Sequence, residues 1–201
     1  MTAPRLVLAS TSPRRRRLLE QLGLRFDVVP ATVDEAALPG EEAVAHVERL
    51  ALHKARAVAA ERPDAVVIGG DTVVVLDGEI LTKPVDPEDA VATLMRLSGR
   101  EHRVETGVAV VAPHRAVVAV VGADVRFRAF GHSEAEDYAA TGEPLDKAGA
   151  YGIQGKGAVL VDSIRGDYFA VMGLPLVAVV RLLREVGIRY RFDGQIVAGE
   201  P

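Results

Sequence analysis

Four consecutive arginines follow a Ser- and Thr-rich turn in the stretch "LASTSPRRRRLLEQLG", residues 8–23. Ser12 is a favourable N-cap for a helix that begins at the next residue. Arg14 and Arg15 then occupy the first turn, where the positive end of the helix dipole costs about 0.3–1 kcal/mol for each cation. A bound phosphate, held by free backbone N–H groups and by hydroxyls such as that of Ser10, would turn this repulsion into attraction.

Two interpretations of the arginine run remain open from these residues alone. A phosphate site accounts for Arg14 and Arg15, whereas a solvated helix face accounts for all four arginines. We expect Arg16 and Arg17 to be solvated in either case, so the distinction rests on the first two.

A lysine interrupts the apolar face of the amphipathic helix predicted over residues 41–63. Lys54 falls inside the stripe formed by Val47, Leu50, Ala51, Ala55 and Val58. A lysine in such a position either extends its ammonium group to solvent or meets an anion. The pattern makes Lys54 a second candidate for phosphate binding.

Carboxylates follow two of the predicted strands. Asp71 comes directly after "VVIGG", and Asp34 and Glu35 end the strand predicted over 26–35. Carboxylates beside a phosphate site are suitable ligands for Mg²⁺, which bridges substrate phosphates, although Asp is also common in ordinary turns. Lys83 follows a predicted hairpin and offers a further phosphate contact.

The glycine-rich segment 142–157 carries Asp146, Lys147, Tyr151 and Gln154. This composition suits a mobile lid or a loop that binds a base, and it also suits an ordinary surface loop. It does not match the phosphate-binding P-loop, because the required Ser or Thr after the lysine is missing.

The elements that must position these side chains alternate between strands and helices. The expected strands cover 5–10, 26–35, 65–81 with a Gly-Gly-Asp turn inside and a hairpin turn at Asp77-Gly78, 100–130 and a hairpin over 163–171. The expected helices cover 13–22, 41–63, 87–98 with Asp86 as cap, 132–141 with a Ser133/Glu136 capping box, and 173–187. The order predicts an α/β fold with a mixed sheet flanked by helices.

Composition narrows the function classes. The 201 residues carry a formal net charge of −4 and no cysteine. Disulfides and thiolate metal sites are therefore excluded, and a general nucleic-acid or anionic-membrane binder is disfavoured. The most apolar run is too short to span a bilayer and no signal peptide is recognised, so a cytoplasmic location is expected.

The chain resembles the Maf family of nucleoside triphosphate pyrophosphatases over nearly its whole length. The resemblance is carried by "LASTSPRRRRLL", "VDE", "RLALHKA", "VIGGDTVV", "GEILTKP", "LSGREHRVETGVAV", "GEPLDKAGAYGIQGKGA" and "GDYFAVMGLPL". It implies one domain over 1–201 with an elongated, inosine triphosphatase-like α/β fold of two lobes and a central cleft. It also implies hydrolysis of a nucleoside triphosphate to the monophosphate and pyrophosphate, a divalent metal (Mg²⁺ or Mn²⁺) and a homodimer.

The resemblance implies roles for individual residues as well. The family's phosphate-binding motif matches Ser10, Ser12, Arg14 and Arg15, and its polar catalytic positions match Glu35, Lys54, Asp71 and Lys83. Asp71 matches the proton acceptor, with Glu35 and Asp71 expected to hold the metal. Three positions that separate the family's substrate subgroups are Arg14, Thr72 and Gln154, and this combination resembles the subgroup acting on dTTP and UTP.

Two other classes remain as rivals. One is a regulatory protein that binds a nucleotide or a partner in the division machinery, with catalysis secondary. The other is an RNA or DNA binder that uses the arginine run, which the acidic net charge and the lack of interleaved aromatic residues disfavour.

Overall fold

The computed structural model describes residues 4–199, which divide into two compact units. Unit 1 comprises the described residues up to Asp71, residues 106–121 and the described residues from Gly173 onward, and unit 2 comprises residues 72–105 and 122–172.

The helices and strands alternate along the first half of the chain. The strands are β1 (Arg5–Ala9), β2 (Asp27–Val28), β3 (Ala65–Leu76), β4 (Glu79–Leu81), β5 (Glu101–Ala112), β6 (Arg115–Phe127), β7 (Val161–Gly166), β8 (Ile188–Tyr190) and β9 (Ile196–Ala198). The α-helices are α1 (Pro13–Gln21), α2 (Ala43–Glu61), α3 (Pro87–Leu97), α4 (His132–Ala139), α5 (Tyr168–Val171) and α6 (Leu176–Glu185). Short 3₁₀ segments cover Glu143–Asp146, Ala148–Ala150 and Lys156–Leu160.

The main sheet has the strand order β2-β1-β3-β5-β6-β7, with β4 paired to β3. Strand β1 pairs in parallel with both β2 and β3, while β4 and β7 pair antiparallel with their neighbours. The expected α/β class with a mixed sheet flanked by helices is therefore confirmed.

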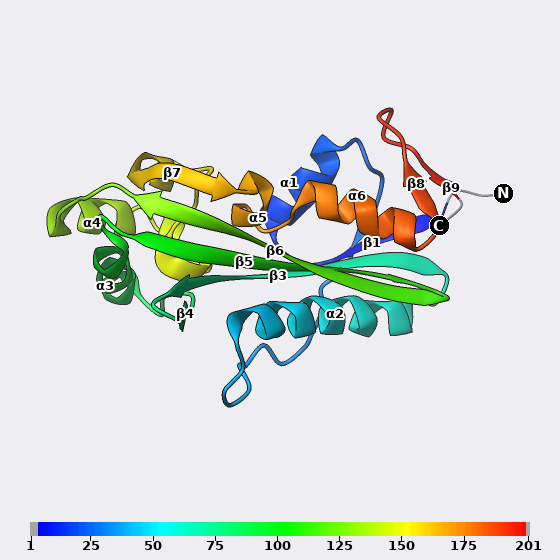
Figure 1. The fold of residues 1–201 in the computed structure, drawn as a ribbon, viewed down its shortest axis with the longest axis horizontal. Coiled ribbons are helices and arrows are strands. Elements are labelled where there is room, and N and C mark those ends of the chain that lie inside the picture. Colours follow the sequence, from blue (N-terminus) through cyan, green and yellow to red (C-terminus); the bar gives the residue numbers. More distant parts are fainter. Residues whose placement is uncertain (1–3, 200–201) are drawn as a thin grey trace. The chain divides into compact units, whose positions relative to one another are not determined.

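In unit 1, helix α2 covers one face of the sheet, and α1 and α6 lie on the other (Figure 1). The apolar stripe of α2 packs on β1 and β3, as the sequence predicts: Val47, Leu50, Ala51, Ala55 and Val58 are all buried. Burial of this stripe fixes which side of α2 faces the sheet, and hence where Lys54 points.

Two glycines allow α2 to lie unusually close to the sheet. A Cβ atom on Gly69 of β3 would stand 2.4 Å from the carbonyl oxygen of Ala51, and one on Gly107 of β5 would stand 2.2 Å from that of Val47. Both distances are far below van der Waals contact, so only glycine fits at these two positions.

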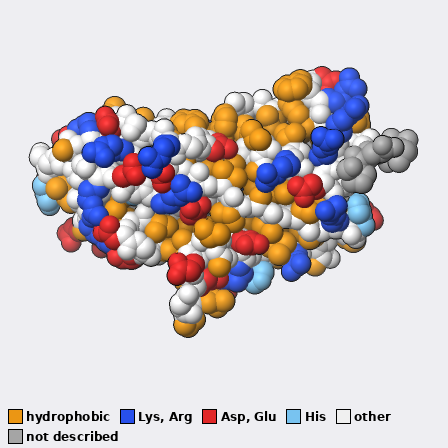
Figure 2. All heavy atoms as spheres, in the orientation of Figure 1, with side chains coloured by type: hydrophobic (Ala, Val, Ile, Leu, Met, Phe, Trp, Pro, Cys, Tyr) orange, Lys and Arg blue, Asp and Glu red, His pale blue; other side chains and the backbone are white. Residues whose placement is uncertain are grey.

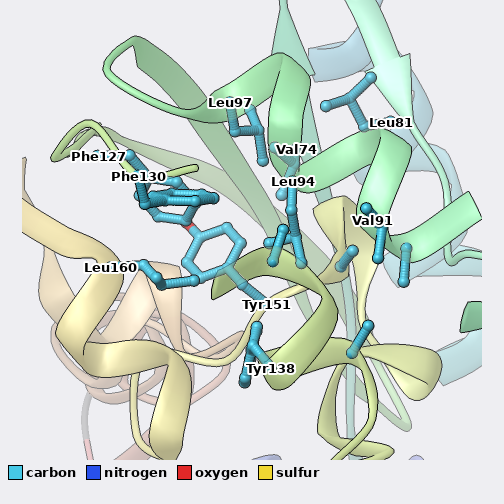
Figure 3. Close-up of a cluster of buried hydrophobic side chains, with 14 of the residues drawn as sticks. Val74, Leu81, Val91, Leu94, Leu97, Phe127, Phe130, Tyr138, Tyr151 and Leu160 are labelled. Carbon is cyan, nitrogen blue, oxygen red and sulfur yellow. The ribbon is translucent and has the colours of Figure 1, made fainter. Parts of the chain in front are cut away.

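Unit 2 has an aromatic core, shown in Figure 3, in which Phe127, Phe130, Tyr138 and Tyr151 pack with aliphatic side chains of β3, α3 and α4. The His102 ring stacks edge-on against both Phe127 and Tyr151, with centroid distances of 4.9 and 5.3 Å. Edge-to-face contacts of this kind add to the stabilisation from burial.

Several local predictions agree with the structure. Ser12 and Asp86 cap α1 and α3, each accepting a backbone hydrogen bond from the residue three positions later. Asp77 and Gly78 form the tight turn between β3 and β4, both with positive φ (52° and 82°), as this hairpin type requires.

Other local predictions are wrong. Gly69, Gly70 and Asp71 form no turn but lie inside the continuous strand β3. The strand expected over 26–35 is reduced to β2. The capping box is absent: α4 starts two residues earlier than it requires, after Gly131, and has no side-chain cap. The hairpin expected over 163–171 is instead β7 followed by α5, which Asp167 caps.

On the face drawn in Figure 2, basic side chains are interspersed with acidic ones, and no large region carries charge of one sign. Within residues 4–199, no helix is both long enough and apolar enough to cross a membrane.

Candidate functional site

The turn between β1 and α1 forms the first part of the candidate site, in unit 1. The hydroxyl of buried Ser10 accepts a hydrogen bond from the backbone N–H of Ser12 (3.1 Å). The hydroxyl of Ser12 accepts in turn from the N–H of Arg15 (3.4 Å). The two serines thus shape the helix N-terminus, which is the part of a helix that favours anions.

The side chain of Arg15 folds back over the turn between β1 and α1. Its Nε donates to the carbonyl oxygen of Gly173 (2.8 Å), and Nη1 donates to the Ser10 hydroxyl (3.4 Å). Burial lowers the pKa of Arg15, the charge of Asp71 opposes this, and the neighbouring Arg14 lowers it further. Arginine nevertheless stays protonated, so a partly buried positive charge stands at the start of α1.

Lys54 is the centre of the second part. Its Nζ lies 2.7 Å from Oδ1 of Asp71 and 2.7 Å from Oε1 of Glu35. Lys54 and Asp71 are each 7% exposed, whereas the Glu35 side chain is 53% exposed. The ammonium group of Lys54 therefore does not extend to solvent but meets anions, here two carboxylates.

The donor set suits a hard divalent cation shared with a substrate. Two carboxylates, Glu35 and Asp71, converge on one ammonium group, and the described residues include no group of three or more His, Cys, Asp or Glu side chains that would hold a metal by themselves. Mg²⁺ is typically bound by one or two carboxylates together with substrate phosphates. The residues present therefore fit such an ion.

Three of the predicted site residues belong to unit 2. Thr72 follows Asp71 on β3, and Lys83 is exposed just after β4. Gln154 is exposed in the turn between two 3₁₀ segments. The remaining predicted residues all belong to unit 1, where Arg15, Lys54, Asp71 and Glu35 interact.

The loop around Gln154 is held by one carboxylate. Glu143 accepts hydrogen bonds from the Tyr138 hydroxyl (2.9 Å) and from the backbone N–H groups of Lys156 (2.9 Å) and Gly157 (3.3 Å). A Cβ atom on Gly155 would lie 2.3 Å from Glu143, so the carboxylate occupies space that only glycine leaves. The loop is therefore an ordered structure with a partly buried anchor.

A second cluster in unit 1, formed by Glu41, His46 and Arg49, was not predicted from the sequence. Arg49 donates from Nε and Nη2 to the two oxygens of Glu41 (2.5 and 2.6 Å), and His46 lies 2.9 Å from the same carboxylate. The available signal was His46, which precedes the apolar stripe of α2 and is buried beside it.

An α/β sheet that leads through a Ser-rich turn to arginines at a helix N-terminus, beside a lysine held by two carboxylates, defines a phosphate-binding α/β protein. The family description "Maf-like protein" matches residues 5–186, and the chain belongs to this family.

Relatives named "dTTP/UTP pyrophosphatase" are similar over nearly their whole length. That of Moorella thermoacetica is 55% identical, covering 92% of this chain and 96% of the relative. That of Yersinia pestis is 53% identical (91% and 92%), and that of Aquifex aeolicus is 47% identical (92% and 96%). Among solved structures, a HAM1 protein from Coxiella burnetii matches with a TM-score of 0.43 and 12% identity, over 62% of this chain and 73% of that chain.

Proposed function

We propose that this chain is a nucleoside triphosphate pyrophosphatase that hydrolyses dTTP and UTP to the monophosphate and pyrophosphate. The observation that carries the proposal is the Lys54 centre, in which one ammonium group joins Asp71 and Glu35 close to the partly buried Arg15. Membership of the Maf family and the names of its relatives support the same activity.

Asp71 serves as the general base in this proposal. Its carboxylate takes a proton from the water whose oxygen attacks the α-phosphorus, and the bond from that phosphorus to the β-bridging oxygen breaks to release pyrophosphate. Lys54 fixes the position of the carboxylate through its contact at Oδ1.

The positive side chains bind the triphosphate and balance the charge that develops on it. Arg14, Arg15, Lys54 and Lys83 take this role, assisted by the hydroxyls of Ser10 and Ser12 at the helix N-terminus. Since phosphoryl transfer depends chiefly on positioning and electrostatics, the order already present around Arg15 favours it.

A divalent cation, Mg²⁺ or Mn²⁺, completes the proposed site. Glu35 and Asp71 would hold it, and when bound it supplies a positive charge that neutralises the phosphate oxygens.

Thr72 and Gln154 would select the base. The Gln154 amide offers a donor and an acceptor, which match a carbonyl and the N3–H of uracil or thymine. The exposed position of Gln154 on an anchored loop supports this role.

The proposal extends to the setting of the reaction. We expect a cytoplasmic homodimer that acts on free nucleotides, not on nucleic acid or a membrane. Hydrolysis of canonical or modified pyrimidine triphosphates would serve nucleotide-pool sanitation, and depletion of dTTP and UTP would be one route to an arrest of cell division.

The test is pyrophosphate release by the purified protein from dTTP, UTP, CTP, GTP and 7-methyl-GTP, with Mg²⁺ or Mn²⁺ present. We expect the highest kcat/KM for dTTP and UTP. A preference for 7-methyl-GTP would refute the subgroup, and release of inorganic phosphate in place of pyrophosphate would refute the reaction class.

A further inference from the structure

The position of Glu35 needs an explanation, because this residue lies in the irregular segment between β2 and α2. Its side chain is half exposed, yet Oε1 stands 2.7 Å from the buried ammonium group of Lys54. An ion pair with one exposed partner is weak compared with the entropy lost on ordering a loop. Other contacts must therefore hold this segment in place.

Arg49 supplies these contacts from α2. Its Nη2 donates to the carbonyl oxygen of Ala36, the residue after Glu35, at 3.0 Å. The same guanidinium group binds both oxygens of Glu41, at 2.5 and 2.6 Å. Arg49 thus ties the residue next to Glu35 to the end of the loop.

Glu41 extends the restraint through the loop itself. Its carboxylate accepts from the backbone N–H of Leu38 (3.1 Å) and lies 2.9 Å from Nδ1 of His46. The Glu41 side chain is only 7% exposed, and its hydrogen bonds from Arg49 hold the pKa of this carboxyl well below its ordinary value. Glu41 and Arg49 therefore stay ionised at neutral pH, and their ion pair restrains the loop.

Two anchors of the loop are side chains of one helix. Lys54 binds the Glu35 carboxylate, and Arg49 binds the backbone beside it. Helix α2 is itself seated on the sheet at Gly69 and Gly107. The position of Glu35 is consequently set by this helix together with the local hydrogen bond from the N–H of Ala36 to the carboxylate of Asp34 (2.9 Å).

We infer that Arg49 and Glu41 are positioning residues that hold the Glu35 carboxylate facing Lys54. The inference rests on the proposed role of Glu35 in the reaction. The competing explanation is that the pair only stabilises the start of α2, in which case it would act independently of Glu35.

A double-mutant cycle separates these explanations. Arg49→Met removes the guanidinium group but keeps much of the side-chain volume, and Glu35→Gln removes the carboxylate charge. We expect Arg49→Met to lower kcat/KM for UTP with Mg²⁺ by about tenfold or more in the natural chain. In the Glu35→Gln background it should change kcat/KM by less than about twofold, because residues that act through one another are not additive.

Arg56→Met is the matched control, since Arg56 is an exposed arginine on the same helix. It should leave kcat/KM within about twofold of the starting value in both backgrounds. If Arg49→Met fails to fold, Arg49→Lys takes its place in the cycle, because lysine keeps the charge and cannot reproduce the bidentate contact.

Hydrogen exchange of the backbone amides supplies a readout that does not depend on turnover. Arg49→Met should speed exchange at residues 36–41 while the amides of β3 keep their protection, and Glu35→Gln should not. Unchanged exchange in the Arg49 variant would overturn the inference.

The kinetic outcomes also distinguish the inference from the proposed function. Two results would overturn the inference alone. One is that Arg49→Met lowers kcat/KM by the same factor in the natural chain and in the Glu35→Gln background. The other is that Arg49→Met has a normal kcat/KM while Glu35→Gln is impaired. Normal kcat/KM in Glu35→Gln would remove the proposed role of Glu35 and the inference together.

Discussion

The Lys54 centre of unit 1 and the Gln154 loop of unit 2 are held by different kinds of contact. Lys54 is buried and fixed by two carboxylates, so its environment is made of charges that depend on one another. Gln154 is exposed, and its loop is fixed through backbone N–H groups that donate to Glu143.

This difference predicts different responses to mutation. Removing one member of a buried charge network leaves the others without compensation, which is costly. An exposed side chain on an anchored loop can be changed while the loop keeps its shape. The proposed base preference can therefore vary while the proposed catalytic centre stays constant.

The largest effect should come from Asp71 in the charge network. Asp71→Asn is nearly isosteric and should lower kcat by roughly 10²-fold or more, because general-base catalysis contributes about this factor. The KM for UTP should change less. Steady-state kinetics on a variant with an unchanged circular dichroism spectrum checks this, and near-normal turnover would contradict the assignment. Rescue by excess Mg²⁺ would favour a ligand role instead.

Acid should destabilise the aromatic core of unit 2 through His102. Nδ1 of His102 is buried without a hydrogen-bond partner among the described residues, and burial lowers the pKa of this imidazole to about 4. The unfolded chain binds the proton near pH 6.5, so stability is complete above that pH and is lost as the pH falls toward 4. We expect a loss of about 2 kcal/mol between pH 7 and pH 5 from this residue.

Urea unfolding at pH 7 and pH 5 measures this loss. His102→Gln should remove about that part of the pH dependence, whereas the exposed His132 of α4 provides a control, since His132→Gln should leave the dependence nearly intact. Identical pH dependence in all three proteins would contradict the role of His102.

Within unit 1, the adjacent residues Arg14 and Arg15 have different surroundings, so their substitution should affect stability differently. Arg15→Ala removes the hydrogen bond to Gly173 and should lower the free energy of unfolding by roughly 1–3 kcal/mol. Arg14→Ala should leave it unchanged or raise it by at most about 1 kcal/mol, since one unfavourable charge leaves the helix N-terminus. Denaturation of the substrate-free protein checks both, and both variants should raise the KM for UTP.

Gln154→Ala should give the smallest change in overall activity. The kcat/KM for UTP should fall by about tenfold while CTP changes less, because truncation removes hydrogen bonds that match the uracil edge. Parallel assays with UTP and CTP measure the ratio, and Lys156→Ala, an exposed neighbour in the same loop, serves as control. An unchanged ratio would place base selection elsewhere.

Local signals in the sequence predicted those parts of the site that depend on neighbours along the chain. Ser12 as a cap and Lys54 in an apolar stripe follow from helix geometry within a few residues. The contact of Arg15 with Gly173 joins residues 158 positions apart, and no local pattern encodes it. The β8–β9 hairpin was also missed.

The error at Gly69-Gly70-Asp71 has a physical cause of its own. Consecutive glycines before an aspartate are typical of a turn. Here Gly69 is required because α2 lies against the strand, a reason that appears only once the helix is docked. The metal and the phosphate-binding and carboxylate residues were predicted from local sequence patterns, whereas the substrate and the role of Thr72 came from the family resemblance. The individual site residues and the metal stay predictions.

The close packing of α2 on the sheet affects how sequence variation in this family is interpreted. Gly69 and Gly107 bear no chemistry, yet in a saturation library selected for growth or turnover they should tolerate replacement as poorly as Asp71, because even alanine would collide with the helix backbone. Gly70, whose added Cβ would meet Arg15 and Gly107 at 3.3 Å, should accept alanine far more readily. Intolerance at 69 and 107 would thus reflect steric fit, and a ranking of positions by intolerance alone would mistake it for catalysis.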